Sequence, residues 1–294
     1  MTTMADMVSE VRRNVYGSMT ENINLVASTY TSGDTVLNLE LPIAGITPGM
    51  MISSGLNTWF VKGTSPNENQ VFVIPGYDDS PSQNAAVNDF VYIKPRMTAW
   101  YAFNKLNDQI KRLSSSMNGL YAMKSWVMPV DSTYQTYVIP TADTDLLNII
   151  RVRYLVPGTP DVWADISNKD WKWQNGQSEQ RVQILINVPS GTDIEFVYQA
   201  PFTQATSLND NVQTVCGLSE TMLDIPALGV SAALLMTSEA RRNQVQTQGD
   251  SRRASEVSIT GNSMASRDFN RLFQARIDEE YIRLVNKTPI FRGI

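Results

Sequence analysis

The order of helical and strand-rich segments constrains the fold of this chain most. Apolar residues recur every three or four positions in four segments, near residues 4–16, 98–113, 225–245 and 264–287, which predicts amphipathic helices. Two long stretches between them contain short β-branched and aromatic runs, separated by glycine and proline turns. This alternation favours a helical part combined with separate antiparallel β modules.

The expected fold class is α+β: a helical bundle domain with two inserted antiparallel β modules, a small β-barrel and a β-sandwich. Each helix carries an apolar stripe that must be buried, and mutual packing of the four helices is the simplest way to bury all of them. The expected helical domain combines residues 1–20, 95–119 and 220–288. The expected insertions are a small β-barrel at residues 33–94 and a β-sandwich at residues 120–203. An extended C-terminal tail is expected at residues 289–294.

The first strand-rich block predicts a small closed or nearly closed barrel. It contains five short runs with strand character, and closure of the sheet would remove its exposed edges. The runs are residues 36–41, 50–52, 58–62, 70–74 and 90–93.

The second block predicts a β-sandwich of about six antiparallel strands. These strands are expected at residues 123–128, 134–139, 147–156, 162–166, 181–188 and 194–199. Three tryptophans, Trp163, Trp171 and Trp173, lie close together before an Asn-Gly turn. Such a cluster could bind a sugar or a nucleobase, but a packing corner or a subunit contact is the commoner role and the one that we favour.

The composition argues against enzymatic chemistry. Histidine is absent and Cys216 is the single cysteine, which excludes Ser-His-Asp and Cys-His mechanisms, His-ligated zinc and cysteine metal cages. No phosphate-binding loop, dinucleotide fingerprint or zinc motif is present. We therefore expect no catalytic residues, no cofactor and no metal. A weak cation site at Asp78-Asp79 and a carboxylate pair for glycoside hydrolysis stay open as minor alternatives.

Charge is distributed unevenly along the chain. Residues 1–224 carry 14 basic and 22 acidic side chains, whereas residues 225–294 carry 10 basic and 7 acidic ones, and nine of those ten are arginines. Two arginine pairs lie in a long polar segment and are candidates for interface or phosphate contacts: Arg241, Arg242, Arg252 and Arg253. No stretch approaches the ~20 apolar residues of a membrane span, so we expect no membrane association.

The first β block also carries a family resemblance. The run GDTVLNLELPIAGITPGMMISSGLNTWFVKG, followed by NQVFVIPGYDDSPSQNAAVNDFVYI, resembles the small barrel modules of tailed-bacteriophage virion proteins. The shared pattern is a Thr-Val strand, a Pro-Gly turn, an aromatic-valine strand, a Gly-Tyr loop and a closing strand after Ala-Ala-Val. The flanking helices resemble those of phage head-to-tail adaptor (connector) proteins. The resemblance covers about the first 125 residues, and the rest only by organisation.

This resemblance implies a structural virion protein that forms a ring in the neck between portal and tail and extends the DNA channel. The implied partners are copies of itself (a homo-oligomer, a dodecamer by resemblance), the portal protein, the next neck or tail protein, and passing double-stranded DNA without sequence readout. The implied location is the virion neck, after assembly in the host cytoplasm. Two alternatives remain: a tail-tube or tail-terminator virion protein, and a carbohydrate-binding or wall-degrading virion protein that uses the tryptophans.

The C-terminal segment is the expected docking site for the portal or another partner. Pro289 ends the last helix, so the residues after it lack local backbone partners. An aromatic side chain, an arginine and isoleucines are suited to anchor an interface or to extend a partner's sheet. The interface residues expected here are Pro289, Ile290, Phe291, Arg292 and Ile294.

Overall fold

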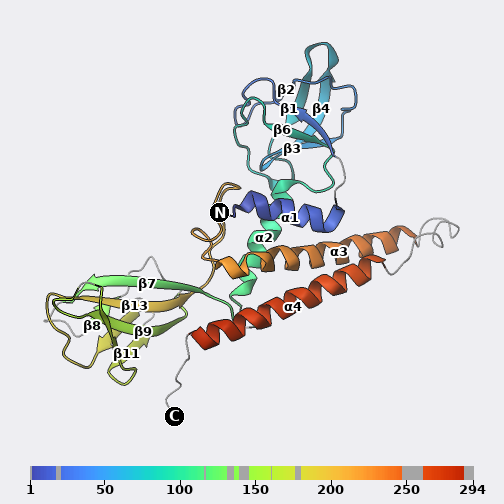
Figure 1. The fold of residues 1–294 in the computed structure, drawn as a ribbon. Coiled ribbons are helices and arrows are strands. Elements are labelled where there is room, and N and C mark those ends of the chain that lie inside the picture. The colour runs from blue at the N-terminus through green and yellow to red at the C-terminus, as the bar shows by residue number, and fades with distance from the viewer. Residues whose placement is uncertain are drawn as a thin grey trace. The chain divides into compact units, whose positions relative to one another are not determined.

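The computed structural model describes residues 2–17, 21–115, 117–130, 136–138, 146–159, 161–175, 180–246 and 261–287 (Figure 1). Four helices and thirteen strands occur in this part of the chain. The chain divides into two compact units. Unit 1 combines Met1–Gln109, Gln204–Val215 and Met222–Arg276, and unit 2 combines Ile110–Thr203, Cys216–Thr221 and Ile277–Ile294.

Unit 1 contains a six-stranded antiparallel sheet in the order β1-β6-β3-β4-β5-β2. Its core is formed by inward-facing aliphatic side chains around Trp59, whose ring meets that of Tyr30 edge-on at 5.1 Å between centroids. The strands are β1 (Asn22–Leu25), β2 (Val36–Asn38), β3 (Met51–Ser54), β4 (Asn57–Ser65), β5 (Gln70–Ile74) and β6 (Phe90–Ile93).

This sheet curls until its two edge strands meet. An antiparallel bridge joins Val26, just after β1, to Leu39, just after β2. Two hydrogen bonds flank the bridge, from Ala27 N–H to Asn38 O and from Glu40 N–H to Leu25 O, both at 2.9 Å. The six strands therefore form a small barrel without free edges, which removes the unpaired backbone groups of an open sheet.

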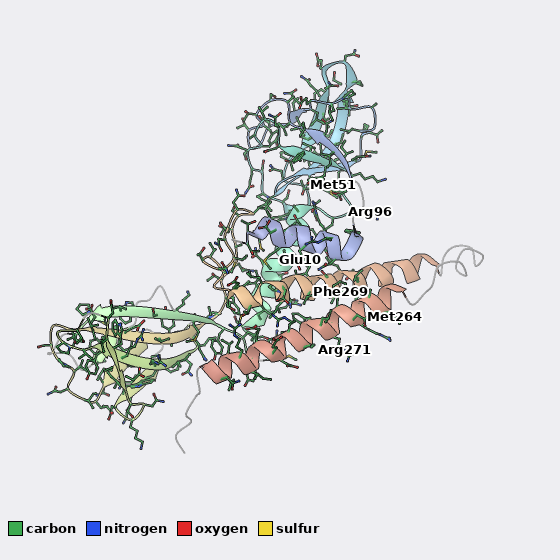
Figure 2. The ribbon with its side chains drawn as sticks, viewed as in Figure 1. Glu10, Met51, Arg96, Met264, Phe269 and Arg271 are labelled. Atoms are coloured by element: carbon green, nitrogen blue, oxygen red, sulfur yellow. The ribbon has the colours of Figure 1, made fainter. Side chains whose placement is uncertain are left out.

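Helix α1 (Met4–Tyr16) is part of unit 1 and begins with a capping box. Thr3 Oγ1 accepts the Asp6 N–H and the Asp6 carboxylate accepts the Thr3 N–H, so the pKa of Asp6 is held below its usual range. Burial raises the pKa of Glu10, which is labelled in Figure 2. The helix contacts α3 (Asp224–Gln246), and its buried side chains are Met4, Met7, Val8 and Val11.

Helix α3 makes close contacts through small residues. An ideal Cβ at Gly229 would lie 2.7 Å from Gln109 Nε2, on α2 (Ala99–Leu113), and 2.9 Å from Phe273 Cε2, on α4 (Gly261–Lys287). The Ser266 hydroxyl on α4 donates to Ala232 O at 3.0 Å. Arg276 binds both carboxylate oxygens of Asp224, at 2.8 and 3.2 Å. These contacts hold the first part of α4 against α3.

Unit 2 contains two antiparallel sheets with one shared core. The four-stranded sheet has the order β10-β9-β13-β7 and the three-stranded sheet the order β11-β12-β8. The bounds are β7 (Ala122–Pro129), β8 (Thr136–Val138), β9 (Asn148–Leu155), β10 (Trp163–Ile166), β11 (Trp171–Asn175), β12 (Gln180–Ile184) and β13 (Asp193–Ala200). The sequence did not indicate β11, because its Trp-Lys-Trp alternation was interpreted as an aromatic cluster.

The second part of α4, from Ile277 onward, belongs to unit 2 and buries a polar residue. Glu280 is 3% exposed and its carboxylate accepts the Thr221 hydroxyl at 3.0 Å. The apolar side chains of Leu272, Tyr281 and Val285 on the same helix are exposed. The buried stripe is thus narrower than the apolar pattern indicated.

The expected fold class, a helical bundle with two small inserted β modules, is wrong. Helix and strand each account for 31% of the described residues, so the β structure is not a minor addition to a bundle. The helices also share their unit with the barrel: Arg12 on α1 lies over the ring of Tyr92 on β6, and the Trp100 indole N–H on α2 donates to Asp78 O at 3.2 Å. An amphipathic stripe shows that a helix buries one face but not which element covers it. The expected boundaries of the domains stay predictions.

One described segment, Glu220–Thr237, is long and apolar enough to cross a membrane by length and composition alone. Half of this window is buried inside the structure, and core helices meet the same criterion. The segment is therefore only weak evidence for a membrane span.

Candidate functional site

A cleft of about 400 Å³ in unit 1 lies between α1, the β3–β4 turn, residues 83–92 and residues 207–209. Arg12 is its most strongly anchored charge: one guanidinium nitrogen donates to Met97 O at 2.7 Å, and the group lies 5.0 Å from the centre of the Tyr92 ring. The Asp89 carboxylate accepts Ala86 N–H at 2.7 Å, and the Asn57 amide oxygen accepts Gln83 N–H at 2.6 Å. These polar groups hold loops and helix together, and the cleft lining presents no paired nucleophile and base.

Asp78 and Asp79 lie in a single 3-10 turn, Tyr77–Asp79, with φ angles of 60° and 56°. They border a second cleft in unit 1, which Trp100, Lys105 and Asp108 also line. Across the described residues, no group of three or more carboxylate or cysteine side chains is placed to bind a metal ion. The minor cation alternative therefore gains no geometric support there.

The three tryptophans do not form one cluster. Trp171 and Trp173 on β11 pack against the sandwich core, and their indole nitrogens are enclosed without a hydrogen-bond partner. Trp163 lies on β10 in the other sheet, with the Arg153 guanidinium 5.1 Å from its ring centre. Arg153 in turn pairs with the buried Glu195 on β13. This arrangement is typical of packing and provides no exposed aromatic platform for a sugar or a base.

The side chains of the remaining predicted site residues lie outside the part of the chain that the structure describes. Arg252, Arg253 and the tail from Pro289 to Ile294 are not among the described residues. Arg241 and Arg242 lie in α3, but only its backbone is described at these positions. Their assignment as interface or phosphate contacts stays a prediction.

The outer surface of the barrel has an apolar face that the sequence analysis did not single out. We call it the first wall and define it as Val36, Phe60, Phe72, Ile74 and Tyr77. Strand register makes it continuous, because Phe72 lies opposite Val36 on β2, and Ile74 opposite Phe60 on β4. The Phe60 and Tyr77 rings stack at 5.3 Å, and Phe72, Ile74 and Tyr77 are 40%, 39% and 43% exposed. Met51 on β3, labelled in Figure 2, lies opposite Phe60 at the border of this wall.

A second apolar face lies on β1 and β6. We call it the second wall and define it as Ile23, Leu25, Leu41 and Phe90. Leu25 lies opposite Phe90, and the Asn24 side chain fixes Leu41 beside β1 by accepting its N–H and donating to its carbonyl, both at 3.0 Å. Ile23, Leu41 and Phe90 are 44%, 47% and 60% exposed. Single exposed apolar residues are ordinary on protein surfaces, but contiguous groups of them mark interaction sites.

Two continuous apolar runs were the sequence signal for these walls. In Val71-Phe72-Val73-Ile74 and in Phe90-Val91-Tyr92-Ile93, apolar residues occupy outward as well as inward positions. A strand with one solvated face alternates apolar and polar residues, whereas continuous runs are typical of strands covered on both faces. The runs predict strands, and their outward apolar side chains also indicate a covered outer face.

No protein-family model matches the sequence, and no curated protein matches it.

Proposed function

We propose that this protein is a structural subunit of the neck of a tailed bacteriophage, forming a homo-oligomeric ring between the portal and the tail. The observation that carries the proposal is the pair of apolar walls on the barrel, which offers contact surface rather than a reaction centre. The resemblance of residues 33–94 to virion barrel modules supports the same assignment.

The polar groups of unit 1 fit this role. Arg12 joins α1 to the Met97 carbonyl, and Asn57 joins the start of β4 to the Gln83 N–H, so both act as cross-links within the unit. A ring subunit must keep its contact surfaces in a fixed geometry while it binds its neighbours, and such cross-links provide this rigidity. The overall charge of −5 suits a channel that double-stranded DNA passes through without being retained.

The experiment that tests this function measures binding to the portal ring of the same phage. Purified full-length protein is mixed with portal and sedimented, and the protein is expected to comigrate at a fixed ring stoichiometry. Deletion of residues 288–294 is expected to abolish comigration, because these residues form the proposed docking segment. Full-length protein that never comigrates with portal would contradict the proposed function. Comigration that survives the deletion would contradict only the assignment of the tail.

A further inference from the structure

We propose that copies of this chain bind one another head to tail through the barrel, with the first wall of one copy against the second wall of the next. This inference rests on the proposed function, in that it names the surface through which the subunits of the ring meet. The occupant of each wall is a second copy of this chain.

The strand order places the two walls on opposite sides of the barrel. Around the closed sheet the order is β1, β6, β3, β4, β5, β2 and then β1 again through the Val26–Leu39 bridge. In a closed barrel of six strands, two strands that are three positions apart present their outer faces in opposite directions. The second wall lies on β1 and β6, and the first wall is centred on β4 and β5, so each strand of one wall is opposite a strand of the other.

Opposite placement selects the type of contact. Two different surfaces on opposite sides of one subunit make a heterologous contact, which continues from copy to copy and closes into a ring when the rotation permits. Each added copy covers one first wall and one second wall, so a closed ring leaves neither exposed. A two-fold dimer through one wall would leave the other wall of each copy in water.

Side-chain chemistry at the borders of the walls supports the pairing of unlike walls. Lys62 is exposed at the bulge of β4, two residues from Phe60 in the first wall. Glu40 is exposed next to Leu25 in the second wall, to whose carbonyl its N–H donates. A first wall facing a second wall brings the Lys62 ammonium group toward the Glu40 carboxylate, which favours that register over contacts between two like walls. Asp78 and Asp79 follow Tyr77 of the first wall and border the cleft that Lys105 also lines.

The outward packing of Phe72 shows that the first wall is a built surface. An ideal Cβ at Gly63, on the neighbouring strand, would lie 3.5 Å from Phe72 Cδ2, so the ring lies against the glycine backbone. An aromatic ring over a glycine on an adjacent strand stabilises the pairing of the two strands and keeps the ring in one position. A fixed aromatic side chain loses little conformational entropy when a partner covers it.

The test uses one charge-introducing substitution in each wall. Phe72→Glu disables the first wall and Phe90→Glu the second, and the mass of each full-length variant is measured by light scattering over a wide concentration range. Each variant alone is expected to be monomeric where the wild type self-associates, with affinity reduced at least roughly 30-fold. A mixture of the two variants is expected to form 1:1 dimers and nothing larger, because only one intact pair of unlike walls remains.

Matched controls keep the result interpretable. Val162→Glu introduces the same charge at an exposed apolar residue of unit 2 and is expected to leave self-association unchanged. Ile74→Glu and Ile23→Glu replace the two main variants if circular dichroism shows that either is unfolded.

Several results would overturn the inference. One is a wild type that stays monomeric at every concentration, and another is a pair of wall variants that associate like the wild type. The third is a single variant that still dimerises alone, because that result indicates contact between two like walls. Because portal binding is measured separately, the two failures are distinguishable: a failure here removes the walls as support for the ring, and a failure there leaves this contact standing.

Discussion

At the scale of single residues, much of the polar chemistry in unit 1 stabilises loops. Asp210 is the clearest case: its carboxylate accepts N–H groups from Thr206 at 2.7 Å and from Ser207 at 2.9 Å. Its backbone carbonyl accepts the Met4 N–H at 3.0 Å, which ties the turn to the start of α1. The N–H groups of Ser207 and Thr206 hold the pKa of Asp210 below its usual value of 3.8.

This pKa shift predicts a pH-dependent effect of Asp210→Ala. A carboxyl whose pKa is lowered by folding stabilises the protein above its unfolded pKa, and that contribution is lost as the pH falls through the folded pKa. We expect the substitution to lower the melting temperature by about 2–4 °C at pH 7. The difference from wild type should shrink below pH 3.8. Thermal melts at pH 7 and below pH 3.8 measure the difference in melting temperature between wild type and variant, with Asn209→Ala as control. An equal difference at the two pH values would contradict this prediction.

At the scale of elements, the helices were predictable and their surroundings were not. Apolar spacing located α1 and α2 within a residue, because this signal depends only on local sequence. Strand β1, the short polar run Asn22–Leu25, was missed because its inward residue is Asn24, a polar side chain that bonds to Leu41. The barrel walls were missed because continuous apolar runs reveal burial on both faces but not the partner. Which helix face meets which element depends on tertiary contacts that local patterns do not encode.

Gly229→Ala tests the close approach around α3. Alanine is favoured over glycine inside a helix by roughly 0.5–1 kcal/mol, but here its Cβ would overlap Gln109 and Phe273. Overpacking of a tight core costs about 1–3 kcal/mol, so the net expectation is a loss of stability. Urea denaturation measures the change in the free energy of unfolding. Gly45→Ala, at a site with open space, is expected to be close to neutral, and a more stable Gly229→Ala variant would show that the approach is not tight.

At the scale of the whole molecule, contact between copies is our proposed reason why several apolar side chains of the barrel are exposed. The barrel closes its own edges, so it does not need a neighbour to complete its sheet. Its outward residues nevertheless form two apolar walls, and contact between copies would bury both. We therefore propose that the protein functions as an assembled subunit.

The most direct test of that claim is the mass and shape of the assembled protein. Native mass spectrometry and electron-microscope images of the full-length protein, alone at high concentration and with the portal ring, would show its oligomeric state. We expect closed rings with a single stoichiometry in at least the portal-bound sample. A protein that remains monomeric in both samples would contradict it.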